Sequence, residues 1–160
     1  MVHNPTLYML VGVPGSGKST WIAQNFPDLT GCYVASTDRL LEIYASMRGA
    51  TYNDVFQDNI DYANKAMMTH VKDAVMYGYN IIWDQTNLTP RSRNYKLAAV
   101  PKTYRKIGIF FPVPETEELY RRLDSRPGKT IPEHAIQQMI NCLKQPTIAE
   151  GFDEVRAAYV

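Results

Sequence analysis

The stretch TLYMLVGVPGSGKST, residues 6–20, joins an apolar run to a glycine-rich loop that ends in a lysine and two hydroxyl side chains. The apolar run Thr6–Val11 predicts a buried strand, and Lys18–Asn25 predicts the helix that follows the loop. Glycines let backbone N–H groups approach phosphate oxygens without a Cβ in the way, and the helix N-terminus adds the positive end of its dipole. The stretch therefore predicts a loop that binds the phosphates of a nucleoside triphosphate.

The loop from Gly12 to Ser19 also satisfies the pattern G-x-x-x-x-G-K-[ST], in the strand–loop–helix context that this pattern requires. We expect Lys18 to reach the β- and γ-phosphates and the Ser19 hydroxyl to ligate Mg²⁺. The residues predicted to bind ATP are Gly12, Pro14, Gly15, Ser16, Gly17, Lys18, Ser19 and Thr20.

The rest of the chain alternates predicted strands with predicted helices. Further strands are expected at 32–36, 79–84 and 105–111, and helices at 38–47, at 53–77, from Pro90 onward, at 114–124 and at 133–143. The last helix should open with a capping box from Thr130 to Glu133. This alternation predicts an α/β fold with a parallel sheet, in which ligands bind beyond the carboxyl ends of the strands. The helix at 53–77 carries an apolar stripe that should face the core: Phe56, Ile60, Ala63, Met67, Val71 and Val75.

Length and composition favour one globular domain over residues 1–160, with 45% hydrophobic residues and a net charge of +1. That charge gives no large footprint for duplex DNA. The sequence shows neither a membrane span nor a secretory signal, and Cys32 and Cys142 lack metal or redox spacing. We therefore expect a cytoplasmic protein with reduced, buried thiols. Six basic residues and no acidic one lie between Arg91 and Lys106, forming either a solvated helix face or a patch that tracks phosphates.

Acidic side chains follow two of the predicted strands. Asp38 follows the strand at 32–36, where it could cap the next helix or serve as a base or substrate ligand. Asp84 closes the strand at 79–84, where it could begin an Asx-turn or orient Mg²⁺. Arg122 and Arg126 share a helix face near a flexible Gly128, so they could be surface arginines or could close over the phosphates.

A bound triphosphate serves switches, motors and kinases, and the residues favour a kinase. The N-K-x-D pattern of GTPases is missing, because Asn64-Lys65 is followed by Ala66-Met67. The chain is also small for a motor. A kinase needs a base near the acceptor hydroxyl and cations that neutralise the transferred phosphoryl group, and Asp38 and the arginines could supply them.

Four segments in this order, GVPGSGKSTW, STDR, DQTNLTPRSR and RRLDSRPGKTIP, resemble the polynucleotide kinase branch of the P-loop kinases, in particular the kinase half of the bacteriophage 5′-polynucleotide kinases. The resemblance covers nearly the whole chain. It implies the five-stranded parallel sheet of adenylate-kinase-like folds with a small arginine lid, ATP as the donor and Mg²⁺ as the cofactor.

The resemblance also implies roles for individual residues. In this family the aspartate that matches Asp38 is the general base, the loop lysine that matches Lys18 holds donor phosphates, and two lid arginines match Arg122 and Arg126. These four are the predicted catalytic residues. The family's D-x-T-N turn, matched by Asp84, Thr86 and Asn87, helps to build the acceptor and metal environment. Together with Ser19 of the glycine loop, Asp84 is a predicted metal ligand. The residues predicted to bind the acceptor are Asp38, Arg39, Asp84, Thr86, Asn87, Arg91 and Arg93.

One position departs from the family. An arginine three residues after the catalytic aspartate grips an acceptor phosphate there, whereas this chain has Leu41. We expect Leu41 to make the wall of the acceptor pocket apolar, and the phosphates of an oligonucleotide to lie along Arg91, Arg93 and Lys96. Arg39 lies nearby on another helix face.

The sequence as a whole predicts an ATP- and Mg²⁺-dependent kinase acting on a hydroxyl of a nucleic acid, most simply the 5′-hydroxyl end of single-stranded DNA or RNA. Two alternatives stay open: a kinase of a hydroxymethylated base in phage-type modified DNA, and a small-molecule or nucleoside kinase. A nucleotide-binding module without catalysis is disfavoured by Asp38 and the R-x-x-x-R segment. No membrane partner is expected, and the sequence does not indicate an oligomeric state.

Overall fold

The structure, a computed structural model, describes residues 4–159. Along these residues the chain forms β1 (Thr6–Val11), α1 (Lys18–Asn25), β2 (Cys32–Ala35), α2 (Thr37–Met47), α3 (Tyr52–Met76), β3 (Asn80–Trp83), α4 (Pro90–Ala99), β4 (Arg105–Phe110), α5 (Thr116–Asp124), α6 (Glu133–Cys142), a short 3-10 helix (Ile148–Glu150) and β5 (Glu154–Ala157).

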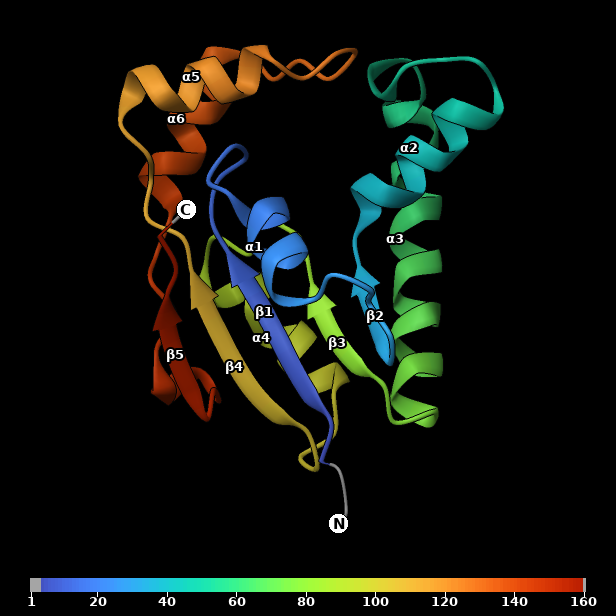
Figure 1. The fold of residues 1–160 in the computed structure, drawn as a ribbon, viewed down its shortest axis with the longest axis vertical. Helices are drawn as coiled ribbons and strands as arrows, with labels where there is room; N and C mark the ends of the chain where they lie inside the picture. Colours follow the sequence, from blue (N-terminus) through green and yellow to red (C-terminus); the bar gives the residue numbers. More distant parts are fainter. Residues whose placement is uncertain (1–3, 160) are drawn as a thin grey trace.

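The strands form a five-stranded sheet in the order β2-β3-β1-β4-β5, and every pairing is parallel (Figure 1). β1 lies in the middle, where Tyr8 is in register with Ile82 of β3 and with Ile107 of β4. The predicted α/β fold with a parallel five-stranded sheet flanked by helices is confirmed. Because all strands run the same way, the loops that follow β1, β2 and β3 meet at one edge of the sheet.

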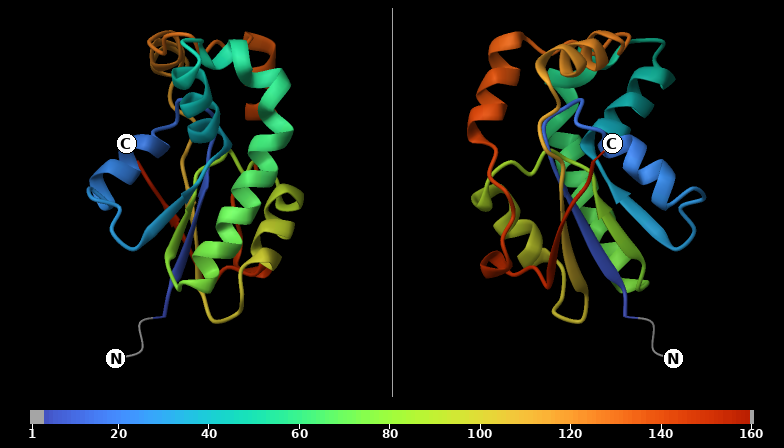
Figure 2. Two further views of the ribbon diagram at one scale, coloured as in Figure 1. Left: turned by 90° about the vertical axis from the view of Figure 1, so that its right-hand side faces the viewer. Right: turned by 60° about the vertical axis from the view of Figure 1, so that its left-hand side comes forward.

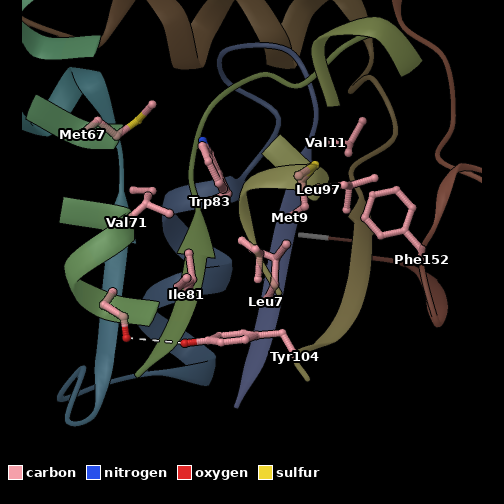
Figure 3. Close-up of a cluster of buried hydrophobic side chains, with 13 residues drawn as sticks. Leu7, Met9, Val11, Met67, Val71, Ile81, Trp83, Leu97, Tyr104 and Phe152 are labelled. Carbon is pink, nitrogen blue, oxygen red and sulfur yellow. Dashed lines mark hydrogen bonds between the residues drawn. The ribbon is translucent and has the colours of Figure 1, made fainter. Parts of the chain in front are cut away.

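Helices cover both faces of the sheet (Figure 2). On one face α3 and α4 pack against the strands, and Met67 and Val71 contact a cluster that includes Ile81 and Trp83 (Figure 3). The Tyr104 hydroxyl closes the lower end of this cluster by donating to the carbonyls of Tyr79 and Ala74. On the other face α1 places Ile22 in a second buried cluster built on β1, β3 and β4, and Trp21 and Phe26 pack against that cluster. Burial of both faces explains why the strands read as apolar runs.

Two helical arms rise beyond the carboxyl ends of the strands (Figure 1). One arm is α2 with the first turns of α3, and the other is α5 with α6. The segment at 125–132 joins α5 to α6 and reaches the start of α3, where the Asn53 N–H donates to the Gly128 carbonyl at 3.2 Å. We call residues 125–132 the lid segment.

Three expectations about the elements are wrong. β5 has no counterpart among the strands predicted from the residues, because its sequence EVRA is short and charged; Glu154 pairs with Arg105 and Arg156 at the exposed edge. The predicted capping box at Thr130 is absent, because α6 begins after Pro132 with no side-chain cap. Phe56 does not face the core; its side chain is 37% exposed, and Val55 is buried instead.

Cys32 is half-buried and Cys142 is exposed, so the expectation of two buried thiols fails at Cys142. Among residues 4–159, the structure contains no helix with the length and apolarity needed to cross a membrane.

Candidate active site

A cavity of about 1630 Å³ opens at the carboxyl edge of the sheet, between the glycine loop, the α2–α3 arm and the lid segment. This volume exceeds the range of about 300–1,000 Å³ that is usual for one small ligand, so the cavity has room for a donor and an acceptor together. Predicted residues from four separate segments line it, namely Lys18, Asp38, Asp84 and Arg126. The fold therefore gathers in one place residues that are far apart in the sequence.

The glycine loop forms the floor of the cavity through Pro14, Gly15 and the start of α1. Two of the predicted ATP-binding residues lie behind this floor instead. Ser16 is buried, and a Cβ on Gly12 would lie 2.6 Å from the Ser16 Oγ and 2.8 Å from the Cβ of Phe111. Gly12 is therefore needed so that the loop can pack against Phe111, which follows β4, and its side of the loop does not line the cavity.

Lys18 points its ammonium along the inside of the loop, where it donates to the carbonyls of Gly12 and Val13 at 2.9 and 3.0 Å. Burial lowers the pKa of Lys18 to about 8, and the carboxylates of Asp84 and Asp38 oppose this only in part. A buried cation with a lowered pKa is stabilised by any anion placed beside it. Lys18 is thus held ready for the phosphates of a nucleotide.

Asp38 lies in the first turn of α2 and lines the cavity. It does not cap the helix, because Ser36 is the N-cap residue and accepts from the Arg39 N–H at 3.3 Å. Its two carboxylate oxygens have different partners: Oδ1 accepts from the Tyr52 hydroxyl at 2.8 Å, and Oδ2 accepts from the Lys129 ammonium at 2.9 Å. The carboxylate is held from two sides and remains half exposed to the cavity.

The two partners of Asp38 also set its charge. Burial raises the pKa of Asp38, but the ion pair and hydrogen bond with Lys129 and the hydrogen bond from Tyr52 outweigh burial, so that the pKa is lowered overall. Burial and the Asp38 carboxylate raise the pKa of Tyr52, so its hydroxyl stays protonated and donates. At neutral pH Asp38 is a carboxylate that can accept a proton.

The lid arginines take different positions. Arg122 donates to the Glu118 carboxylate at 2.6 Å and to the Gly15 carbonyl at 3.1 Å, which fixes α5 over the glycine loop. Arg126 lines the cavity beyond the end of α5, and its Nη1 is buried without a hydrogen-bond partner among the atoms of residues 4–159. A buried guanidinium nitrogen without a partner is costly, and a phosphate oxygen in the cavity would satisfy it.

Asp84 and Thr86 line the cavity opposite the lid, as does Arg39 from α2. Burial raises the pKa of Asp84, although Lys18 and Arg39 act against the shift. The Gly12 N–H donates to the Thr86 carbonyl at 3.0 Å, which ties the turn after β3 to the glycine loop. In residues 4–159 no group of three or more His, Cys, Asp or Glu side chains could hold a metal ion. Mg²⁺ is usually bound by one or two protein ligands together with substrate phosphates, so Ser19 and Asp84 remain suitable ligands.

Three residues predicted to bind the acceptor do not reach the cavity. Arg93 is fully buried and forms a paired contact with Glu150. Asn87 is buried at a positive φ of 48°, and its side chain donates to the Leu10 carbonyl and accepts from a lysine of α4. Arg91 is exposed and lines a separate small hollow beside α4. Arg93 and Asn87 are thus engaged by contacts within the protein, which leaves them unavailable to an acceptor, and Arg91 lies outside the cavity.

Two further expectations fail because the side chains concerned are buried: the phosphate path along the basic run, and the apolar pocket wall at Leu41. Lys96 is buried, and its ammonium donates to the Asn87 Oδ1, so the α4 side chains cannot form a continuous path for phosphates. Leu41 is fully buried between α2 and α3, where it packs with Ala63 and other core residues. The wall of the cavity beside Asp38 is therefore not made by Leu41.

Two residues of the site were not predicted from the sequence. Lys129 belongs to the lid segment and, besides its ion pairs with Asp38 and Glu42, lies 4.4 Å above the Tyr52 ring. The segment RPGKTIP contains Lys129, but a single surface lysine carries no spacing signal. Tyr52 is missed because its partner Asp38 lies fourteen positions away on another helix.

Residues 7–146 match the model of a protein family described as AAA domain (AAA_33). The chain belongs to this family. Solved structures similar to this AAA_33 domain include a chain of the Pnkp1/Rnl/Hen1 RNA repair complex, which is 25% identical with a TM-score of 0.68. That match covers 89% of this chain and 45% of the other, so the AAA_33 domain spans less than half of the repair-complex chain.

Two further structures show how widely the fold is used. A fungal RNA kinase is 14% identical with a TM-score of 0.58, over 99% of this chain and 39% of that one. A gluconokinase from Sinorhizobium meliloti 1021 is 18% identical with a TM-score of 0.56, over 99% of this chain and 84% of that one. The AAA_33 domain thus has the P-loop kinase fold, which serves kinases with chemically different acceptors. The fold and the site together support a phosphotransferase.

Proposed function

We propose that this AAA_33 domain is an ATP- and Mg²⁺-dependent kinase that phosphorylates a hydroxyl of a nucleic acid, most simply the 5′-hydroxyl end of DNA or RNA. The observation that carries the proposal is the position of Asp38. A carboxylate that is half exposed, ionised and held from two sides lies in the same cavity as the glycine loop and Arg126. ATP as the donor and two free thiols fit a cytoplasmic protein.

The donor side of the cavity fits the phosphates of ATP. The Arg126 Nη1 has no partner within the described residues, and the Lys18 ammonium is paired only with neutral carbonyls. Phosphate oxygens would satisfy both groups with charge-assisted hydrogen bonds. Ser19 at the start of α1 and Asp84 opposite it would hold Mg²⁺, which supplies charge neutralisation at the β- and γ-phosphates.

The transfer assigns a task to each residue. Asp38 accepts the proton of the acceptor hydroxyl while the acceptor oxygen bonds to the γ-phosphorus, and the bond from that phosphorus to the β,γ-bridging oxygen breaks to leave ADP. Lys18 and Arg126 stabilise the charge on the transferred group. Tyr52 and Lys129 keep the Asp38 carboxylate oriented towards the cavity.

The nucleic-acid acceptor is supported by the similarity to the chain from an RNA repair complex, which covers 89% of this chain. A second candidate is a small-molecule or nucleoside kinase, and one observation favours it. The acceptor half of the cavity is lined by Glu42, Asp54 and Asp58 as well as Asp38, whereas Arg39 is its cation from α2. Many acceptor phosphates would be poorly accommodated there, so a short acceptor end fits better than a long tracked strand.

The proposal is tested with labelled ATP on 5′-hydroxyl DNA, 5′-hydroxyl RNA, base-modified DNA and nucleosides, with wild-type protein and Asp38→Asn. We expect label on a 5′-hydroxyl oligonucleotide and a loss of at least about 10²-fold in kcat for Asp38→Asn, with little change in ATP affinity. Glu42→Gln is the matched control, because Glu42 also pairs with Lys129. This variant should lose far less activity than Asp38→Asn. Label on nucleosides alone would replace the nucleic-acid proposal with the second candidate, and collapse of ATP binding in Asp38→Asn would place Asp38 on the donor side.

A further inference from the structure

An aromatic surface lies beside the candidate base and has no part in the chemistry described above. Phe56 faces the cavity from the second turn of α3 with 37% of its side chain exposed. The helical spacing of apolar residues would place it in the core, yet Val55 takes the core position instead. An apolar ring turned into a polar cavity is available to a ligand.

The ring of Phe56 contacts Tyr52, which is itself hydrogen-bonded to the candidate base. Its ring centroid lies 5.6 Å from that of Tyr52, with the planes tilted by 43°. The Tyr52 hydroxyl in turn donates to Asp38 at 2.8 Å. Tyr52 thus contacts both Phe56 and Asp38, and all three residues line the same cavity.

The surroundings of Phe56 suit a planar heterocycle. Ile43 of α2 adds apolar surface to the same wall, and Gln57 adds an amide that can donate and accept at the edge of a base. Lys129 already occupies the face of Tyr52, at 4.4 Å from its centroid. The face of Phe56 is therefore the aromatic surface that the cavity offers to an acceptor. Of the cations near it, Lys129 is already paired with Asp38 and Glu42, and Arg39 lines the cavity from α2.

We propose that Phe56, backed by Tyr52, is a stacking platform for the nucleobase of the nucleotide that carries the acceptor hydroxyl. The inference rests on the proposed function and adds the means by which the acceptor end is held. Stacking accepts every base because each has a π-face, so the platform gives affinity without strong sequence preference. In the acceptor half of the cavity, which is lined by several carboxylates, stacking would bind the acceptor through its base and not through its phosphates.

The test compares two oligonucleotides with a 5′-hydroxyl end, one with a normal terminal nucleotide and one whose terminal nucleotide is an abasic tetrahydrofuran. We expect wild-type protein to prefer the normal end by about 10-fold or more in kcat/KM, within the usual range for stacking on one aromatic side chain. Phe56→Ala should reduce this preference to about twofold or less, with the KM for ATP unchanged, and Phe56→Trp should keep it.

The ratio between the two acceptors separates stacking from damage to the base, because a misplaced Asp38 would slow both acceptors equally. Tyr62→Ala is the matched control: Tyr62 is an exposed aromatic on the same helix that packs against Tyr44 outside the cavity, and its loss should leave the ratio at the wild-type value. Equal efficiency for both ends in the wild type, or an unchanged ratio in Phe56→Ala, overturns the platform and leaves the proposed function standing. No phosphorylation of either end overturns both.

Discussion

Adding a methyl group at Gly128 should weaken docking of the lid segment, and with it activity, without unfolding the rest of the domain. Gly128 has φ +68°, and its carbonyl accepts from the Asn53 N–H where the lid segment meets the start of α3. A Cβ at this position would lie 2.9 Å from the Cβ of Thr51 and 3.0 Å from its Cγ2. Gly128→Ala therefore places a methyl group against an atom that is not the end of a flexible side chain.

The magnitude follows from two contributions. A left-handed backbone costs a residue with a Cβ about 1–2 kcal/mol. Forcing an extra methyl group into a packed contact costs typically about 1–3 kcal/mol. Together they disfavour the docked lid segment by at least about 2 kcal/mol, which is a factor of ~30 in its population. Docking brings Lys129 to Asp38 and keeps Arg126 in the cavity, so we expect kcat/KM to fall by about 30-fold or more.

The control is Gly78→Ala. Gly78 has almost the same φ, +69°, but its Cβ would meet no atom within 4 Å, and it lies at the opposite edge of the sheet. It carries the same backbone strain without the contact at Thr51. We expect the two variants to have similar thermal unfolding midpoints, while only Gly128→Ala loses activity. If Gly128→Ala is as active as Gly78→Ala, the docked lid segment is not required for transfer.

Three further predictions concern the cations of the structure. Arg126→Ala should lower kcat and kcat/KM together by about 10²-fold, and Arg126→Lys should restore little of the loss, because a point charge lacks the guanidinium fork; a change confined to the KM for ATP would contradict this. Burial lowers the pKa of Lys18 to about 8, so bound phosphates should raise it again. Calorimetry with metal-free ATP at pH 8.5 should then show net proton uptake, and equal binding enthalpies in buffers of different ionisation enthalpy would refute it. Arg93→Met should lower the free energy of unfolding in urea by about 3–5 kcal/mol, because it removes the guanidinium that pairs with Glu150 and donates to the Asn87 and Lys144 carbonyls. Arg93→Met combined with Glu150→Met should recover part of the loss.

Most of the fold could be predicted because local signals agree with the tertiary arrangement. β1 and α1 have the predicted bounds Thr6–Val11 and Lys18–Asn25, since an apolar run, a glycine loop and a helix start are all coded within a few residues. β5 could not be predicted in this way. Its residues Glu154–Ala157 form a strand because β4 offers a free edge, and that edge exists only after the chain has folded.

The site was predicted where a motif fixes the position of a side chain and missed where packing fixes it. Lys18 lies where the loop after β1 enters α1, and Asp38 lies in the first turn of the helix after β2, so their place at the carboxyl edge comes with the topology. Arg93 belongs to a basic run that reads as a solvated or phosphate-binding face. Its side chain is instead buried because Glu150, from a distant segment, offers a bidentate partner. Charge in a sequence does not reveal which charges will find a partner inside the fold.

Three cations of the site are held by oxygen atoms of the protein, and this bears on catalysis. The Lys18 ammonium is held by the Gly12 and Val13 carbonyls, Arg122 by Glu118 and the Gly15 carbonyl, and Lys129 by Asp38. Each charge is thus fixed in direction by protein oxygens rather than left to solvent. Groups oriented in advance need little reorganisation when charge develops on a transferred phosphoryl group. Lys129 differs from the other two because its partner is the proposed base itself, so movement of the lid segment would alter both the position and the basicity of Asp38 together.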